Sequence, residues 1–173
     1  MSQQRITKDE SEKGWSFDLK RVQIDLFHML SIFLAENKYA SILIDENDPL
    51  WSLASFGEPE ITRILINSAV VGRVIDDRED RFLSNCEAFC GELLFKEKTE
   101  GLNLREAFNK IIHAKAFDLV INKTDGQFHY IEPIIYLHGY IRENKWEAKL
   151  DIIAYIREYN RNIVGVEKDE QFT

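Results

Sequence analysis

Cysteine, proline and glycine are scarce in this chain, whose 173 residues include two Cys, three Pro and eight Gly. So little Pro and Gly argues against a disordered chain. Two Cys cannot build a disulfide framework, and the polar, mixed-charge N-terminus lacks the apolar stretch of a signal peptide. The sequence therefore predicts a protein of the reducing cytoplasm.

Long apolar runs and positive charge are also in short supply. No apolar stretch approaches about 18 residues, so we expect no membrane span. Lys plus Arg is 22 against 30 for Asp plus Glu, a formal net charge of −8. This balance disfavours RNA as a partner, because binding to nucleic acid depends on neutralising phosphates. It fits better with a protein partner or a cationic one.

Motifs for cofactors and metals are missing as well. The sequence has no Gly-rich phosphate loop and no G-x-G-x-x-G. Its four His residues are scattered, without the paired spacing of metal ligands. An acidic run at Asp45, Glu46 and Asp48 is similar to a calcium loop but lacks the required Gly and closing Glu. We expect neither a cofactor nor a metal.

Hydrophobic residues are plentiful, at 45% of the chain, with 12% aromatics. A chain of this length and composition can bury a sizeable core in one domain. We predict a single globular domain over residues 15–163, preceded by a flexible arm over 1–14 and followed by a tail over 164–173.

The spacing of apolar residues predicts an α+β fold. Steps of three and four residues indicate helices, and alternation indicates strands. Four helices are expected first: residues 18–36, a second helix that begins at Pro59, residues 81–96 and residues 103–114. An antiparallel meander over 116–152 and a helix over 151–163 follow. The expected architecture is a four-helix bundle followed by a small antiparallel β-meander and a C-terminal helix.

Two groups of apolar residues carry more specific expectations. Trp51, Leu53 and Phe56 lie in the connection between the first two helices, and we expect them to pack back on the bundle. Cys86 and Cys90 are four residues apart on the third predicted helix, which places them on one face as buried structural thiols.

The second helix contains a glycine and an ion pair. Gly72 costs helix stability, so it predicts a close crossing with another helix. Arg73 and Asp77 have the i, i+4 spacing of a surface ion pair. Alternatively, Arg73 faces His113 across the bundle and supplies a cation there.

The segment 103–114 combines a helix signal with a chemical one. Asn103 is a good N-cap, and Glu106 can return a hydrogen bond to it, as in a capping box. Arg105, Asn109 and His113 follow one another at intervals of four, so they line one edge of the helix. A cation, an amide and an imidazole therefore lie on the same side.

Residues 109–114, NKIIHA, resemble the signature helix of the HEPN superfamily of small helical domains. Asn109 and His113 match the Asn and His of that motif, whereas Phe108 stands where the motif has Arg. The resemblance implies a HEPN-like four-helix bundle, often dimeric, and many members of that superfamily are metal-independent ribonucleases.

Two functions follow from these observations. The first is a non-catalytic interaction or regulatory protein on a HEPN-like scaffold, from a mobile-element or defence context, bound to a protein partner or to itself as a homodimer. The alternative is a metal-independent ribonuclease, with His113 as general acid or base, Arg105 or Arg73 as the cation and Asn109 orienting the phosphate. His113 can equally serve the helix alone, through the carbonyls at its C-terminus.

Overall fold

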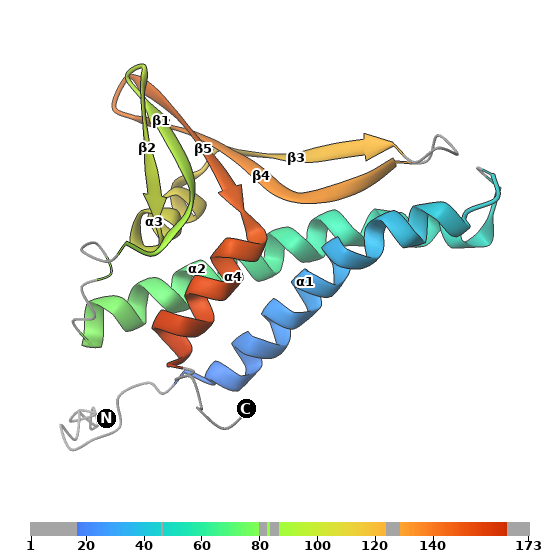
Figure 1. Cartoon of the computed structure of the whole chain (residues 1–173), viewed down its shortest axis with the longest axis horizontal. Helices are drawn as coiled ribbons and strands as arrows, with labels where there is room; N and C mark the ends of the chain where they lie inside the picture. Colours follow the sequence, from blue (N-terminus) through green and yellow to red (C-terminus); the bar gives the residue numbers. More distant parts are fainter. Residues whose placement is uncertain (1–16, 46, 80–82, 84–86, 124–128, 166–173) are drawn as a thin grey trace, which may run out of the picture.

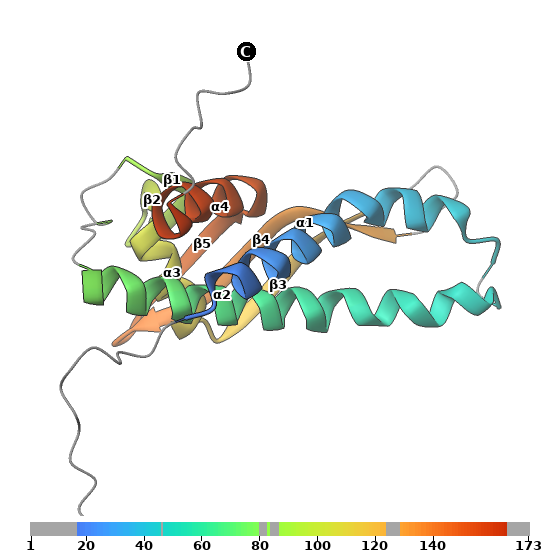
Figure 2. The same ribbon diagram turned by 90° about the horizontal axis from the view of Figure 1, so that it is seen from below.

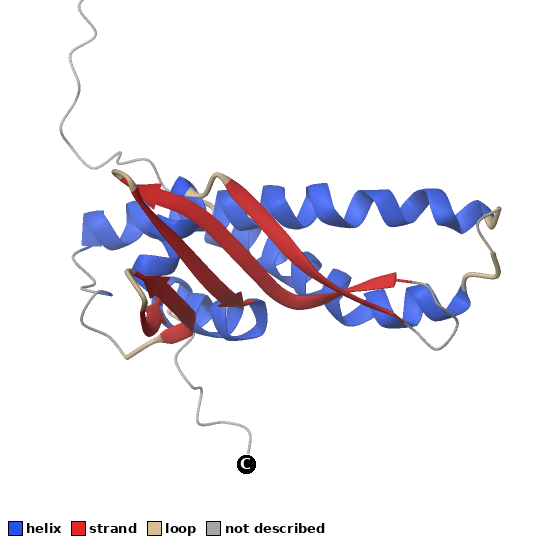
Figure 3. Cartoon of the chain, turned by 90° about the horizontal axis from the view of Figure 1, so that it is seen from above, coloured by secondary structure: helices blue, strands red, loops and turns tan. Residues whose placement is uncertain are grey.

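Five antiparallel strands form one sheet in the order β2-β1-β5-β4-β3, and the helices lie on one of its faces (Figure 1). The computed structural model describes residues 17–45, 47–79, 83, 87–123 and 129–165. Within these residues, the other face of the sheet carries no helix (Figure 3). The sheet is thus covered on one side, an arrangement common for antiparallel sheets.

The elements alternate along the chain rather than falling into a helical half and a strand half. In order they are α1 (Leu19–Ile42), the 3₁₀ helix η1 (Pro49–Phe56), α2 (Gly57–Glu79), β1 (Phe89–Phe95), β2 (Lys98–Asn103), α3 (Leu104–His113), β3 (Ala116–Lys123), β4 (His129–Ile141), β5 (Asn144–Asp151), α4 (Ile152–Tyr159) and the π-helical turn η3 (Asn160–Val164). None of the described helices is both long enough and apolar enough to cross a membrane.

Side-chain caps fix where three of the helices begin. Asp18 caps α1, Asn103 caps α3 and Asp151 caps α4, each accepting from the backbone N–H three residues on, at 3.0, 2.8 and 2.9 Å. Such caps satisfy N–H groups that have no partner within the helix. The predicted starts near residues 18, 103 and 151 are confirmed.

The register of the central strands sorts their residues between the core and the uncovered face. Ile135 pairs with Leu150, and Leu137 with Ala148, and all four are buried against the helices. His138 follows Leu137 directly, so its side chain points to the uncovered face, because side chains alternate along a strand. The predicted meander is confirmed as β3, β4 and β5, but it is part of a larger sheet.

The predicted four-helix bundle is wrong, because the sheet is large and central. Residues 81–96, expected as its third helix, include β1, which pairs with β2 on one side and β5 on the other. The hairpin turns at Lys96 and Glu97, with φ of 49° and 65°. Tight hairpin turns need positive φ angles of this kind. The Asn-Gly pair that usually marks them is absent here, so the sequence did not predict the turn.

The helical face predicted for the two cysteines is wrong at Cys90, which lies on a strand. Cys90 is buried on β1, where its thiol contacts the carbonyl oxygen of Leu102 at 3.5 Å. Burial raises the pKa of the Cys90 thiol to about 12, so the group is inert, as predicted for a structural thiol. Cys86 lies outside the described residues.

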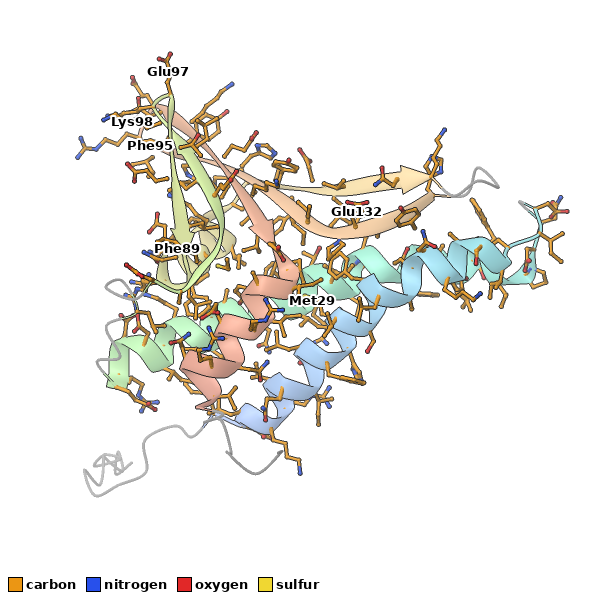
Figure 4. All side chains as sticks on the ribbon, in the orientation of Figure 1. Met29, Phe89, Phe95, Glu97, Lys98 and Glu132 are labelled. Carbon is orange, nitrogen blue, oxygen red and sulfur yellow. The ribbon has the colours of Figure 1, made fainter. Side chains whose placement is uncertain are left out.

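The helices form a layer beneath the sheet, in which α1 contacts both α2 and α4, and α2 and α4 also contact each other (Figure 2). Met29 of α1, wholly buried, lies in the layer between helices and strands (Figure 4). A Cβ on Gly72 of α2 would overlap the rings of Phe108 and Tyr159, so the predicted close crossing is confirmed. The α1–α2 hairpin ends in a connection at the right of Figure 1, opposite the β1–β2 hairpin.

Candidate functional site

The structure brings three of the four predicted site residues together between α2 and α3. Arg73 donates from Nη1 to Oδ1 of Asn109, across the two helices. It also donates from Nε to Asp77, at 3.0 Å, as the i, i+4 spacing predicts. Arg105 donates to Oδ2 of Asp76 and, at 2.5 Å, to Oδ1 of Asp77.

Both guanidinium groups of this cluster form ion pairs with carboxylates. Asp76 is only 6% exposed, and Arg105 supplies the positive charge that pairs with this buried carboxylate. The hydrogen bond from Arg105 holds the pKa of Asp77 below its ordinary value, despite the opposing effect of burial. A cation that stabilises a phosphorane must face the substrate, whereas these two face aspartates.

His113 stands apart from this cluster. It is the last residue of α3 and is exposed. In the described part of the chain, no hydrogen bond or ion pair joins His113 to Arg73, Arg105 or Asn109. The contact that the ribonuclease hypothesis needs is therefore not formed here, and the roles of these residues stay predictions.

A polar chain continues from this cluster toward the sheet. Asn109 donates to Glu106 at 3.3 Å, and Glu106 pairs with Lys110 at 2.9 Å. The Nζ of Lys110, on a side chain only 6% exposed, lies 4.6 Å from the ring centroid of Trp146 on β5. Glu106 thus uses its carboxylate on Asn109 and Lys110 rather than returning a bond to the N-cap. These contacts join α2, α3 and β5.

A second candidate site lies at the connection between α1 and α2. Six large apolar side chains are exposed there, from 38% at Leu50 to 83% at Ile44. We call this set the apolar tip; it comprises Ile42, Ile44, Leu50, Trp51, Leu53 and Phe56. The expectation that Trp51, Leu53 and Phe56 pack back on the core is wrong, since each is at least 40% exposed.

Local hydrogen bonds explain why the tip stays outside the core. Helix α1 continues to Ile42, beyond its predicted end at Glu36, and carries the connection away from the sheet. Asp48 then accepts from the backbone N–H of Leu50 at 2.9 Å and of Ile44 at 3.1 Å. The hydroxyl of Tyr39 donates to the Leu50 carbonyl. These bonds hold the connection as a turn followed by η1, with its apolar side chains facing outward.

A pocket of about 590 Å³ opens beside the apolar tip. We call it the tip pocket; its walls come from the last turns of α1, from η1 and from the first turns of α2. Leu53 and Phe56 belong to both the tip and the pocket, which makes the two one continuous surface. The size and the apolar lining of the tip pocket are typical of a binding site for an apolar side chain or a small segment.

Another hollow, of about 730 Å³, lies on the uncovered face of the sheet near the β4–β5 turn. His138 borders it, between Asp118 on β3 and Glu147 on β5. The Nε2–Oδ2 distance to Asp118 is 2.9 Å, without hydrogen-bond geometry, and Nδ1 is 3.4 Å from Glu147. Lys96 and Glu97 of the β1–β2 hairpin also line the hollow, and Glu97 lies at the tip of that hairpin (Figure 4).

Among the described residues, no three His, Cys, Asp or Glu side chains are grouped so that they could hold a metal ion. The acidic run of the calcium-like loop supplies its carboxylates instead to local turn bonds, as at Asp48; Glu46 lies outside the described residues. The chain matches no protein-family model, no curated protein and no solved structure.

Proposed function

We propose that this protein is a non-catalytic interaction or regulatory protein, and that it binds a protein partner through the apolar tip and the tip pocket. The observation that carries the proposal is the exposure of six large apolar side chains within residues 42–56. Contiguous apolar surface of this kind is costly in water, and it marks interaction sites in folded proteins.

The placement of the core supports this role. The hydrophobic core lies between the sheet and the helix layer, and the exposed side chains of η1 add nothing to it. Phe56, at 66% exposed, and Leu53, at 50%, gain little from folding and would gain far more from a partner. Their exposure is difficult to explain by stability alone.

Electrostatics favours a different protein over a second copy at this surface. Residues 36–60 hold six carboxylates, at positions 36, 45, 46, 48, 58 and 60, and a single lysine, Lys38. Two tips placed against each other would bring like charges together, which costs several kcal/mol when they are close. A partner with basic residues around an apolar segment gains both from the attraction of opposite charges and from the burial of apolar surface.

Quantitative affinity capture tests the proposal in cells that produce the chain. The tip variant is Leu53→Ser with Phe56→Ser, and the matched control is Leu94→Ser with Ile121→Ser on the sheet, where both side chains are also exposed. We expect at least one protein to be recovered equally by wild type and control and at least tenfold less by the tip variant. Equal recovery of every captured protein by both variants would contradict the proposal.

The ribonuclease remains the alternative function. The hydrogen bond between Arg73 and Asn109 favours it, because two residues of the predicted site do meet across α2 and α3. The carboxylates of Asp76 and Asp77 oppose it, since they occupy Arg73 and Arg105. A ribonuclease would require these ion pairs to open when RNA binds.

A further inference from the structure

Two glutamates line the tip pocket, and they differ in their partners. Glu60 accepts two hydrogen bonds from Arg63, at 2.7 and 2.8 Å, so its charge is balanced. Glu36 has no such partner: among the described residues, no Lys or Arg forms an ion pair with it. The pocket therefore contains one carboxylate that lacks a cation.

Glu36 lines the pocket with its carboxylate beside Gly57. Its Oε1 lies where a Cβ on Gly57 would come within 3.2 Å, so Gly57 leaves room for the carboxylate. Partial burial raises the pKa of Glu36, although the backbone N–H of Ile131 counteracts the effect by hydrogen bonding. A partly desolvated carboxylate attracts a cation more strongly than one in open water.

The walls of the pocket select what kind of cation can enter. Ile32, Leu53 and Phe56 offer apolar surface on the way to Glu36. Lysine and arginine carry their charge on long apolar stems, so they match a pocket with apolar walls and a carboxylate within it. A small inorganic cation would leave the apolar walls uncovered, and the described residues do not group ligands for one.

We propose that the tip pocket binds a segment of a partner protein in which a lysine or arginine stands beside an apolar residue, with the cation on Glu36 and the apolar side chain on Leu53 and Phe56. The proposal rests on the function proposed above and specifies the chemistry of its partner. The excess of carboxylates over residues 36–60 draws the same kind of segment toward the tip.

Selection from a phage-displayed library of random 12-residue peptides tests this chemistry on the full chain. We expect enriched peptides to contain Lys or Arg next to a large apolar residue, and synthetic copies to lose at least tenfold in affinity on Glu36→Gln. Glu58→Gln is the matched control, since Glu58 is exposed and does not line the pocket, and it should change affinity less than threefold. With Glu36→Lys, a peptide whose cation is replaced by Glu should regain binding.

The outcomes separate this inference from the function on which it rests. Peptides that lose affinity with Leu53→Ser but not with Glu36→Gln would overturn the role of Glu36 and leave the proposed function intact. A selection that yields no peptide sensitive to Leu53→Ser or Phe56→Ser would overturn both.

Two other occupants of the pocket have their own signatures. A dimer in sedimentation that dissociates on Phe56→Ser would identify a second copy. A carbodiimide cross-link from Glu36 to Lys8 or Lys13 within a monomer would identify the chain's own N-terminal segment. Either result would overturn the assignment to a partner protein.

Discussion

A Cβ atom on Gly72 would overlap the ring of Phe108, so α2 and α3 approach more closely than any other residue at position 72 permits. The same Cβ would meet the ring of Tyr159 on α4. The two rings pack edge to face, with centroids 5.8 Å apart. Three helices thus converge on one glycine, and this contact fixes the helix layer that supports the tip.

The substitution Gly72→Ala should therefore destabilise the protein, although alanine favours helix by about 1 kcal/mol. Overpacking against two buried rings costs about 1–3 kcal/mol beyond that gain. Asn67→Ala, at an exposed position of α2, should change the free energy of unfolding by less than about 0.5 kcal/mol. Urea denaturation measures both, and a Gly72→Ala protein as stable as wild type would disprove the close crossing.

Removing the positive charge of Arg105 should cost about 3 kcal/mol, because Arg105→Met leaves Asp76 buried without its cation. The control is Arg21→Met, which removes a side chain that is 64% exposed and 3.7 Å from Asp25, and it should cost less than about 1 kcal/mol. Chemical denaturation at neutral pH compares the two. Similar losses would show that the Arg105 pair contributes no more than a surface ion pair.

The same variant should alter how stability depends on pH. The folded-state pKa of Asp77 is lowered, mainly by the hydrogen bond from Arg105. A lowered carboxylate pKa stabilises the fold above the ordinary value of 3.8, and this contribution is lost as pH falls through the folded pKa. The gap between wild type and Arg105→Met should therefore narrow below about pH 4. A gap that widens in acid would contradict this assignment.

The pKa of Glu36 is shifted in the opposite direction from that of Asp77. Partial burial raises its folded-state pKa, so the ionised form destabilises the fold at pH values above the ordinary 4.5. Glu36→Gln should raise the melting temperature at pH 7. The difference from wild type should disappear near pH 4, where the Glu36 side chain of the wild type is neutral as well. Scanning calorimetry at both values measures this. A lower melting temperature at pH 7 would show that Glu36 serves stability rather than binding.

The ribonuclease alternative predicts that His113→Ala reduces RNA cleavage at least about a hundredfold, the usual contribution of a general acid or base. The interaction protein predicts no RNA cleavage by wild type or variant, and we expect that result. Under the ribonuclease alternative, Asn109→Ala should lose less cleavage than His113→Ala. Reproducible cleavage by wild type that disappears in His113→Ala, with an unchanged melting curve, would reverse the choice between the two functions.

Capping and alternation made part of the fold predictable. Asn103 and Asp18 are local signals, since a side-chain oxygen three residues before an N–H can be read from the sequence. The strands of residues 116–152 alternate clearly, and their pairing follows. The irregular pairing between Leu119 and Ile121 lies opposite the part of β4 that contains Pro133, a residue that cannot donate to the ladder.

The larger errors come from long-range pairing. The apolar residues of 81–96 fit a helical spacing, but β1 is stabilised by pairing with β5, more than 50 residues later. Gly91 was the available signal: a Cβ there would overlap the Lys149 carbonyl, so the glycine permits the close approach of the two strands. The exposure of the apolar tip could not be predicted from apolar spacing either. The outward direction of Trp51 and Phe56 depends on the hydrogen bonds that Asp48 accepts in the turn.

Site-specific photo-cross-linking tests the central claim most directly. A p-benzoylphenylalanine residue replaces Phe56 at the tip or, as the control, exposed Ile121 on the sheet, in cells that produce the chain. We expect a discrete cross-linked partner from position 56, absent from position 121 and lost when Leu53→Ser is added. A partner that cross-links from position 121 but not from position 56 would contradict it.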